Sequence, residues 1–200
     1  MSVPPVCAMV LAGGLARRMG GEKAFAKLAG KPLIAHAIAR LTPQCQALAI
    51  NSNDDPTWFE PFDLPVIADT VADFPGPLAG ILAAMDWCAT SHPGTAYVLT
   101  APVDCPFLPD DLTARFWDAR EGMDIIVANS GDRLHPTVAL WRVGLREDLR
   151  RHLTSGGTRR LVSWMETYKN KRVDWPAEPF DPFFNVNTPD DLNDAILRLR

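Results

Sequence analysis

The 200-residue sequence has no apolar run near the length of a membrane-spanning helix, which needs about 20 residues. Its opening residues, MSVPPVCAMVLAGG, carry no basic side chain and only a short apolar stretch, so no signal peptide is predicted. Internal repeats and low-complexity tracts are also absent. With 47% hydrophobic and 22% charged residues, the composition is that of a soluble globular protein without a membrane partner.

Cysteine and histidine are scarce, with four of each. The cysteines include no close pair and have no ligand-like spacing with the histidines; they are Cys7, Cys45, Cys88 and Cys105. Zinc sites and disulfide frameworks are therefore both disfavoured, and a reducing, cytoplasmic location is predicted.

Positive charge is in the minority, because the formal net charge is −4. Binding to nucleic acid through a general positive field is therefore disfavoured. One local exception is LAGGLARRMGGEKAFAKLAG, residues 11–30, which holds five glycines and four cationic side chains. Such a cluster in an acidic protein predicts a local anionic partner.

Strand-like and helix-like patterns alternate along the first two thirds of the chain. Strands are predicted at 6–12, 46–50, 64–68, 96–100, 124–128, 135–141 and 171–175, the last at a sheet edge. Helices are predicted at 33–41, 78–88, 111–120, 145–153 and 158–168, and a last one opens at the Thr188 cap. This alternation indicates an α/β fold with a mostly parallel sheet, covered on both faces, that binds ligands at the carboxyl ends of its strands.

The glycine-rich stretch after the first strand matches neither G-x-G-x-x-G nor G-x-x-x-x-G-K-[ST]. It has Gly13-Gly14, then Arg17-Arg18, then Gly20-Gly21 and Lys23. Glycines let backbone N–H groups approach a phosphate closely, while arginine and lysine supply charge. A strand followed by a tight turn would need no cations in that frame, so a phosphate-binding loop is the favoured interpretation.

The pattern L-A-G-G-x₃-R-M-G-x-x-K resembles the signature loop of nucleotidyltransferases that act on sugar phosphates and on molybdopterin. RRMGG followed by lysine is most similar to the molybdenum cofactor guanylyltransferases of the MobA type. Further similar stretches follow in the family's order: GKPL at 30–33, DFPGPLAG at 73–80, PVDCPFLP at 102–109, HPTVAL at 135–140 and NVNTPDDL at 185–192.

The resemblance implies one nucleotidyltransferase domain over residues 1–200. It would be a three-layer α/β/α sandwich with a Rossmann-like sheet, a nucleotide-binding half at about 1–105 and a molybdopterin side at about 106–200. The implied reaction transfers GMP from GTP to the terminal phosphate of molybdopterin and releases pyrophosphate, with Mg²⁺ as cofactor. Transient contact with proteins that make or accept the cofactor is also implied.

The triphosphate is expected to lie against Arg18, Lys23 and the backbone of Gly13 and Gly14. Because the spacing before the lysine is shorter here than is usual in the family, Lys27 remains the alternative to Lys23. Asp104 follows a buried strand, which places its carboxylate at the carboxyl end of the sheet. Mg²⁺ takes one or two carboxylates, so Asp104 is the predicted metal ligand.

The resemblance further implies nucleotide contacts from the Leu11 and Ala12 main chain and from Asn51 and Asp69. Both side chains lie at predicted strand ends, on the same edge as the loop. Turn residues are the equal alternative for both, because Asn and Asp are favoured in turns.

For the second substrate, Gly76 and Gly80 would let the backbone approach a pterin phosphate. Anionic groups would be bound by Arg159 or Arg160, just after two glycines. Asn185 and Asn187 alternate along an extended stretch, so their amides are expected on one face, facing the pterin.

Three rival functions remain open at this point. The loop would also serve transfer from CTP to molybdopterin, or nucleotide transfer to a sugar phosphate. A non-catalytic nucleotide sensor is the alternative outside the enzymes, although a sensor has no need of a metal-binding carboxylate beside a phosphate lysine.

Overall fold

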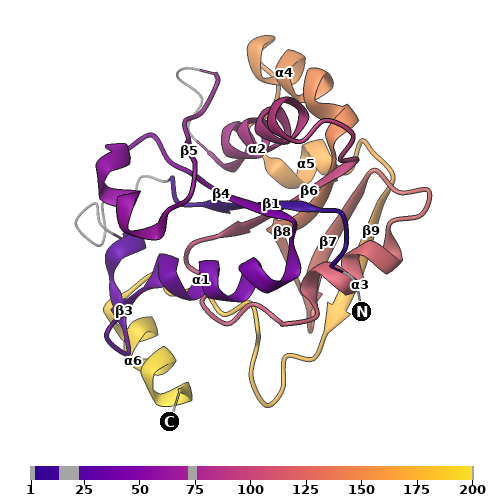
Figure 1. The fold of residues 1–200 in the computed structure, drawn as a ribbon. Coiled ribbons are helices and arrows are strands. Elements are labelled where there is room, and N and C mark those ends of the chain that lie inside the picture. The colour runs from indigo at the N-terminus through magenta and orange to yellow at the C-terminus, as the bar shows by residue number, and fades with distance from the viewer. Residues whose placement is uncertain (1–2, 14–22, 72–75, 200) are drawn as a thin grey trace.

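The computed structural model describes residues 3–13, 23–71 and 76–199 and shows a central seven-stranded sheet between two helical layers (Figure 1). The strand order is β5-β4-β1-β6-β8-β7-β9. The strands are β1 (Cys7–Leu11), β4 (Ala47–Asn51), β5 (Val66–Ile67), β6 (Tyr97–Pro102), β7 (Ile125–Ser130), β8 (Arg133–Arg142) and β9 (Asn170–Trp175). The three-layer, mostly parallel sandwich predicted from the sequence is confirmed.

The sheet is parallel except where β8 pairs with its neighbours β6 and β7. A tight turn joins β7 directly to β8, and Gly131 supplies the positive φ of 54° that this turn requires. All other strand pairs are parallel, so the carboxyl ends of β1, β4, β5, β6 and β7 lie along one edge of the sheet.

The two helical layers are formed by different helices. The helices are α1 (Leu33–Leu41), α2 (Pro77–Ser91), α3 (Leu112–Ala119), α4 (Arg146–Thr154), α5 (Leu161–Met165) and α6 (Pro189–Arg198). In Figure 1, α1 and α3 cover one face of the sheet, while α2, α4 and α5 cover the other. No helix in the described part of the chain is long and apolar enough to cross a membrane.

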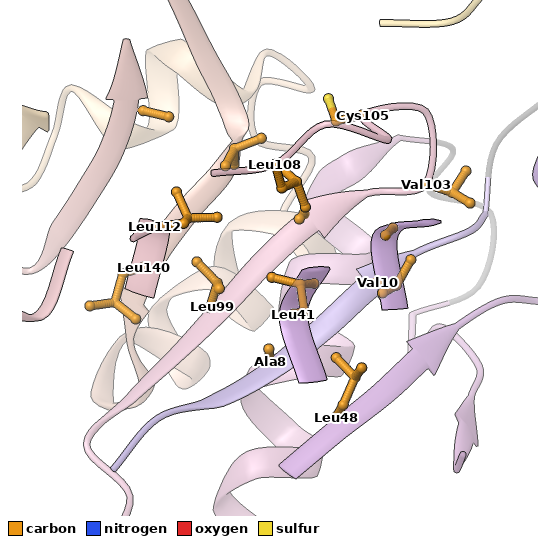
Figure 2. Close-up of a cluster of buried hydrophobic side chains, with 14 of the residues drawn as sticks. Ala8, Val10, Leu41, Leu48, Leu99, Val103, Cys105, Leu108, Leu112 and Leu140 are labelled. Atoms are coloured by element: carbon orange, nitrogen blue, oxygen red, sulfur yellow. The ribbon is translucent and has the colours of Figure 1, made fainter. Parts of the chain in front are cut away.

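Strand β1 is buried along its whole length because alternate residues enter opposite cores. Ala8 and Val10 pack under α1 and α3, in the cluster shown in Figure 2. Cys7, Met9 and Leu11 pack under α2. A strand covered on both faces reads as a continuous apolar run, and this explains why the sequence pattern located it.

A small third hydrophobic core packs the C-terminal helix against a hairpin from the N-terminal part of the sequence. Helix α6 lies beside the short hairpin of β2 (Lys27–Leu28) and β3 (Lys31–Pro32) (Figure 1). Leu28, Val186 and Ala195 meet there in a buried cluster. This packing brings the segment before α6 next to the residues that follow the glycine-rich loop.

Several predicted elements differ from the structure in extent. The helix predicted at 158–168 is the five-residue α5, because the Thr158 hydroxyl accepts a bond from Arg160 N and holds the chain in a turn instead of a helix. The strand predicted at 64–68 has two residues. The β2–β3 hairpin was not predicted, nor were the 3-10 helices η2 (Lys23–Phe25), η3 (Thr42–Gln44), η4 (Pro56–Phe62) and η5 (Val143–Leu145).

Candidate active site

Three polar side chains meet at the carboxyl edge of the sheet. The Lys23 ammonium donates to Asp104 Oδ2 at 2.5 Å and to Asn187 Oδ1 at 2.6 Å. The lysine and aspartate side chains are only 16% and 15% exposed, so their ion pair is largely shielded from water. Two oxygens from distant parts of the chain thus converge on one cation. We call Lys23, Asp104 and Asn187 the lysine cluster.

Asp104 is held in place by the turn that ends β6. Val103 N donates to Leu11 O at 3.0 Å, which extends the β1–β6 pairing past the last residue of the strand. Cys105 N then donates to Pro102 O at 3.3 Å and closes the turn. The Asp104 carboxylate therefore projects from the carboxyl end of a buried strand, where the sequence predicted it.

Asn187 is held by the start of α6. The Asp191 carboxylate accepts from Asn187 N and Thr188 N, both at 2.9 Å, and Thr188 Oγ1 accepts from Asp191 N at 3.1 Å. This reciprocal pair is a capping box. The bond from Asn187 N lowers the pKa of Asp191, because it stabilises the charged carboxylate.

The extended segment before α6 lies beside the turn after β6 and is hydrogen-bonded to it. Val186 N donates to Asp104 O at 2.9 Å, and the buried Cys105 thiol donates to Asn185 Oδ1 at 2.9 Å. Burial raises the pKa of Cys105 well above its ordinary value, so this thiol is a hydrogen-bond donor and not a nucleophile. Asn185 and Asn187 both contact the β6 side, one through Cys105 and the other through Lys23.

A second polar cluster lies at the ends of β4 and β5. Asn51 Nδ2 donates to Asp69 Oδ1 at 2.9 Å and to Ile67 O at 3.0 Å. Asn53 Nδ2 donates to the other Asp69 oxygen at 2.8 Å, and Asp69 N donates to Asn53 Oδ1 at 2.8 Å. The sequence placed Asn51 and Asp69 on this edge but missed Asn53, whose side chain fixes the carboxylate from the opposite side.

Gly80 is explained by close packing. It is buried in α2, and a Cβ there would lie 2.4 Å from Asn51 Oδ1 and 3.1 Å from Leu11 Cδ2. Only glycine fits without displacing the asparagine. The structure therefore gives Gly80 a packing role against Asn51 and Leu11, whereas its predicted contact with a pterin phosphate stays a prediction.

The remaining predicted nucleotide residues are placed as follows. Leu11 ends β1, and Ala12 N donates to Asn51 O at 2.9 Å, which ties the loop entry to β4. Gly13 lies beside the Asn51 side chain, because a Cβ built on Gly13 would be 3.8 Å from Asn51 Oδ1. Gly14 and Arg18 lie outside the described residues. Lys27 is exposed in β2, whereas Lys23 contacts Asp104.

The predicted pterin residues Gly76 and Arg160 precede two different helices, α2 and α5. Gly76 precedes α2 with a φ of 140°, a value that favours glycine. Arg160 is exposed at the start of α5, on the face covered by α2 and α4. Its neighbour Arg159 occupies the same connection. Gly157 is required there by packing, because a Cβ would lie 2.5 Å from the His152 ring.

Sequence reasoning missed a polar trio at the end of β7, made by the buried Ser130 and His135 and the half-buried Asp181. Ser130 Oγ lies 2.7 Å from His135 Nε2 and donates to Asp181 Oδ1 at 2.8 Å. Asp181 Oδ1 also accepts from Phe183 N at 2.9 Å, and burial lowers the pKa of His135. The HPTVAL stretch was the available signal, but Asp181 lies 51 residues after Ser130 in the sequence. This trio anchors the start of the segment that carries Asn185 and Asn187.

The oxygens of Asp104 and Asn187 are of the kind that a divalent cation binds. In the part of the chain that the structure describes, no three His, Cys, Asp or Glu side chains gather in a group able to hold a metal ion. Mg²⁺ in phosphoryl sites has different needs: one or two protein oxygens, with waters and phosphate oxygens supplying the remaining ligands. The Asp104 carboxylate and the Asn187 amide oxygen already converge on one cation and meet that requirement.

Two relatives resemble the chain over nearly its whole length. A molybdenum cofactor guanylyltransferase from Nitrobacter hamburgensis is 50% identical over 198 residues, covering 98% of this chain and 95% of that protein. Another from Rhodopseudomonas palustris is 51% identical over 195 residues, covering 96% of this chain and 93% of that protein.

A solved structure resembles the chain as a whole. The crystal structure of molybdopterin-guanine dinucleotide biosynthesis protein A from Archaeoglobus fulgidus matches with a TM-score of 0.74 and 26% identity, covering 96% of this chain and 98% of that one. The profile of the MobA-like NTP transferase domain matches residues 8–171. The chain therefore belongs to the family of MobA-like NTP transferase domains.

Proposed function

We propose that this protein is a molybdenum cofactor guanylyltransferase. It transfers GMP from GTP to the terminal phosphate of molybdopterin, forming molybdopterin guanine dinucleotide and releasing pyrophosphate. A phosphate oxygen of molybdopterin forms the new bond to the α-phosphorus of GTP, and the bond from that phosphorus to the pyrophosphate oxygen breaks. The proposal is supported by relatives of about half identity over nearly the whole chain that carry this name.

The lysine cluster is the structural observation that supports this reaction. Phosphoryl transfer concentrates negative charge on the non-bridging and leaving oxygens, so cations and positioning matter more than an acid–base residue. Lys23 would bind triphosphate oxygens together with Arg18 and the Gly13 and Gly14 backbone. Asp104 and Asn187 would hold Mg²⁺, which when bound neutralises charge that develops on the phosphates. Asp104 and Asn187 come from distant parts of the chain and meet at Lys23, so we expect the reacting phosphates to bind beside this cluster.

Recognition of guanine is proposed at the β4–β5 edge. Asp69 has both oxygens fixed by asparagine donors, yet a carboxylate has about four acceptor sites, so it retains capacity for further donors. Guanine presents the N1–H and N2–H₂ donors on one edge, a pair that cytosine and adenine lack. Asn51 and the Leu11–Ala12 main chain would position the base beside that carboxylate.

The second substrate is proposed to lie on the C-terminal side of the lysine cluster. Asn185 and the Gly76 and Gly80 backbone are the predicted contacts of molybdopterin, with Arg160 (or Arg159) for its anionic groups. Asn187, also predicted as a pterin contact, is assigned in this proposal to the metal. Cytoplasmic location and transient contact with proteins that make or accept the cofactor are part of the same proposal. All four cysteines are free thiols, as a reducing compartment favours.

A product assay tests the function. The purified protein is incubated with Mg²⁺, molybdopterin and either GTP or CTP, and both the dinucleotide and pyrophosphate are quantified. The proposal predicts both products from GTP and little from CTP. Preferential use of CTP would assign a cytidylyltransferase. Tight GTP binding without pyrophosphate release would assign a sensor, and turnover with a sugar phosphate in place of molybdopterin would assign a different acceptor.

A further inference from the structure

We propose that the Lys23 ammonium and the divalent ion are alternative occupants of a single cation site formed by Asp104 and Asn187. Before the nucleotide binds, Lys23 fills the site; the triphosphate then attracts the lysine and lets the metal ion enter. The inference rests on the proposed nucleotide chemistry and adds a control on when metal binds. It also makes Asn187 a cation ligand, a role different from the pterin contact predicted from the sequence.

The contact distances place the ammonium in the centre of the site. Lys23 Nζ lies 2.5 Å from Asp104 Oδ2 and 2.6 Å from Asn187 Oδ1. Mg²⁺ binds oxygen ligands at about 2.0–2.1 Å, so an ion using these two oxygens would overlap the nitrogen. The two cations cannot share the position, and their repulsion would be strong in a pocket where the lysine and aspartate are only 16% and 15% exposed.

The backbones of both oxygen-bearing residues are fixed independently of the lysine. Asp104 is held through its own carbonyl, which accepts from Val186 N, and through the closed turn after β6. Asn187 is held through its backbone N–H, which donates to Asp191. When Lys23 leaves, both residues therefore stay within reach of another cation. Their fixed backbones favour metal binding because only side-chain torsions remain to be ordered.

Lys23 has the properties of a movable counter-ion. Its ammonium is a compact point charge on a flexible four-carbon stem with three donors, two of which the cluster uses. A triphosphate offers it several anionic oxygens in exchange for Asp104 and Asn187. Asn187 is an exposed residue, so the cluster is open to ligands on that side.

The exchange predicts how nucleotide and metal affinities are linked. Without nucleotide, the intact protein binds divalent ions weakly, because Lys23 competes for the same oxygens. With nucleotide, the lysine is drawn away and metal affinity rises; by reciprocity, the metal raises nucleotide affinity by the same factor. Removing the ammonium should therefore strengthen metal binding in the absence of nucleotide, although it weakens triphosphate binding.

The test is a Mn²⁺ titration of the full-length protein without nucleotide, with free Mn²⁺ followed by electron paramagnetic resonance. Lys23→Met keeps the length of the side chain and removes its charge. We expect it to bind one Mn²⁺ about tenfold or more tightly than the unchanged protein, within the range usual for coupled sites. Lys31→Met is the matched control: Lys31 is an exposed lysine in the nearby hairpin, and its removal should leave Mn²⁺ affinity unchanged.

Second substitutions locate the ion. In the Lys23→Met background, Asp104→Asn should abolish the added affinity, and Asn187→Ala should remove most of it. Equal Mn²⁺ affinity in Lys23→Met and the unchanged protein would overturn the exchange, as would a gain that survives Asp104→Asn. A gain that survives Asn187→Ala would overturn the assignment of Asn187. Thermal unfolding of each variant verifies that the compared proteins are folded.

The outcome is separable from the proposed function. Mn²⁺ binding without nucleotide does not depend on which triphosphate or acceptor the enzyme uses. Tighter binding by Lys23→Met together with a failed GTP assay would retain the exchange and reject guanylyl transfer. Unchanged Mn²⁺ binding by Lys23→Met together with a successful GTP assay would reject the exchange and retain guanylyl transfer.

Discussion

The nucleotide edge and the C-terminal segment are built by different means, although they meet at the same lysine. The nucleotide edge, made by the ends of β1, β4, β5 and β6, inherits its geometry from parallel strand pairing. The C-terminal segment, residues 176–188, has no strand or helix. It is held by polar side chains, Asp181 at one end and Asp191 at the other, by one backbone bond from Val186 N to Asp104 O, and by the buried Phe183 and Val186. The first region is thus positioned by repeated backbone pairing, and the second by a few separate contacts.

This difference predicts which substrate each region affects. Substitutions at the nucleotide edge should alter GTP binding first, and those that loosen the C-terminal segment should alter molybdopterin binding first. Only the lysine cluster belongs to both regions, so changes there should affect the chemical step most.

The largest expected effect is at Asp104. Asp104→Asn removes the charge that would hold Mg²⁺ and should lower kcat/KM by about 10³-fold, the scale of losing one preorganised electrostatic group. The measurement is pyrophosphate release with GTP and molybdopterin. Asp110→Asn is the control, because Asp110 is an exposed partner of Arg40 just beyond the same turn. An Asp104→Asn enzyme with near-normal turnover would refute the metal assignment.

The next effect is at Gly80, on the nucleotide edge. Gly80→Ala would place a Cβ 2.4 Å from Asn51 Oδ1, and relief of this overlap should cost about 1–3 kcal/mol of folding free energy. Displacement of Asn51 should also raise the KM for GTP more than that for molybdopterin. Urea unfolding and steady-state kinetics measure the two effects.

A double substitution tests the cause of the Gly80 effect. Adding Asn51→Ala to Gly80→Ala removes the overlapping side chain. The double variant should therefore lose less folding free energy than the sum of the losses of the two single variants. Gly144→Ala is the control, because the nearest atom to its Cβ would be Arg142 Nε at 4.0 Å. Strict additivity would show that the Asn51 contact is not the source of the loss.

A smaller effect is expected at the start of the C-terminal segment. Asp181→Asn weakens the bonds from Ser130 Oγ and Phe183 N to a charged acceptor, at a cost of about 1.5 kcal/mol. The KM for molybdopterin should rise while GTP affinity, measured by calorimetry, stays the same. Weakened GTP binding with an unchanged KM for molybdopterin would contradict the assignment of molybdopterin to the C-terminal segment and of GTP to the nucleotide edge.

The smallest effect concerns the cap of α6. Asp191→Asn should cost about 1 kcal/mol or less at neutral pH, as caps usually do. Because the pKa of Asp191 is lowered in the folded protein, the carboxylate stabilises the fold above its unfolded pKa, and this contribution disappears as the pH falls through the folded pKa. The stability difference between the two proteins, from urea unfolding, should therefore shrink in acid. A difference independent of pH would contradict this account.

The two regions also differ in how far the sequence predicts them. Strand β1 and the positions of Asn51, Asp69 and Asp104 were predictable, because each follows an apolar run and parallel strands bring such ends to one edge. Asn53 was missed because its contact with Asp69 depends on how two short connections fold.

The C-terminal segment shows why the remaining contacts were not predictable. Asn185 and Asn187 stood out as a pair, but their partners Cys105 and Lys23 are remote in the sequence. Ser130, His135 and Asp181 carry no local pattern, since their contacts arise only when β7, β8 and the segment are brought together. Long-range polar contacts of this kind depend on the completed fold.

The most direct test of the central claim is a crystal structure with a non-hydrolysable GTP analogue and Mn²⁺, located by its anomalous scattering. The account predicts a Mn²⁺ peak beside Asp104 and Asn187, with the Lys23 ammonium moved onto the phosphates and the guanine next to Asp69. A nucleotide bound away from this edge, or Mn²⁺ elsewhere while Lys23 still contacts Asp104, would contradict it.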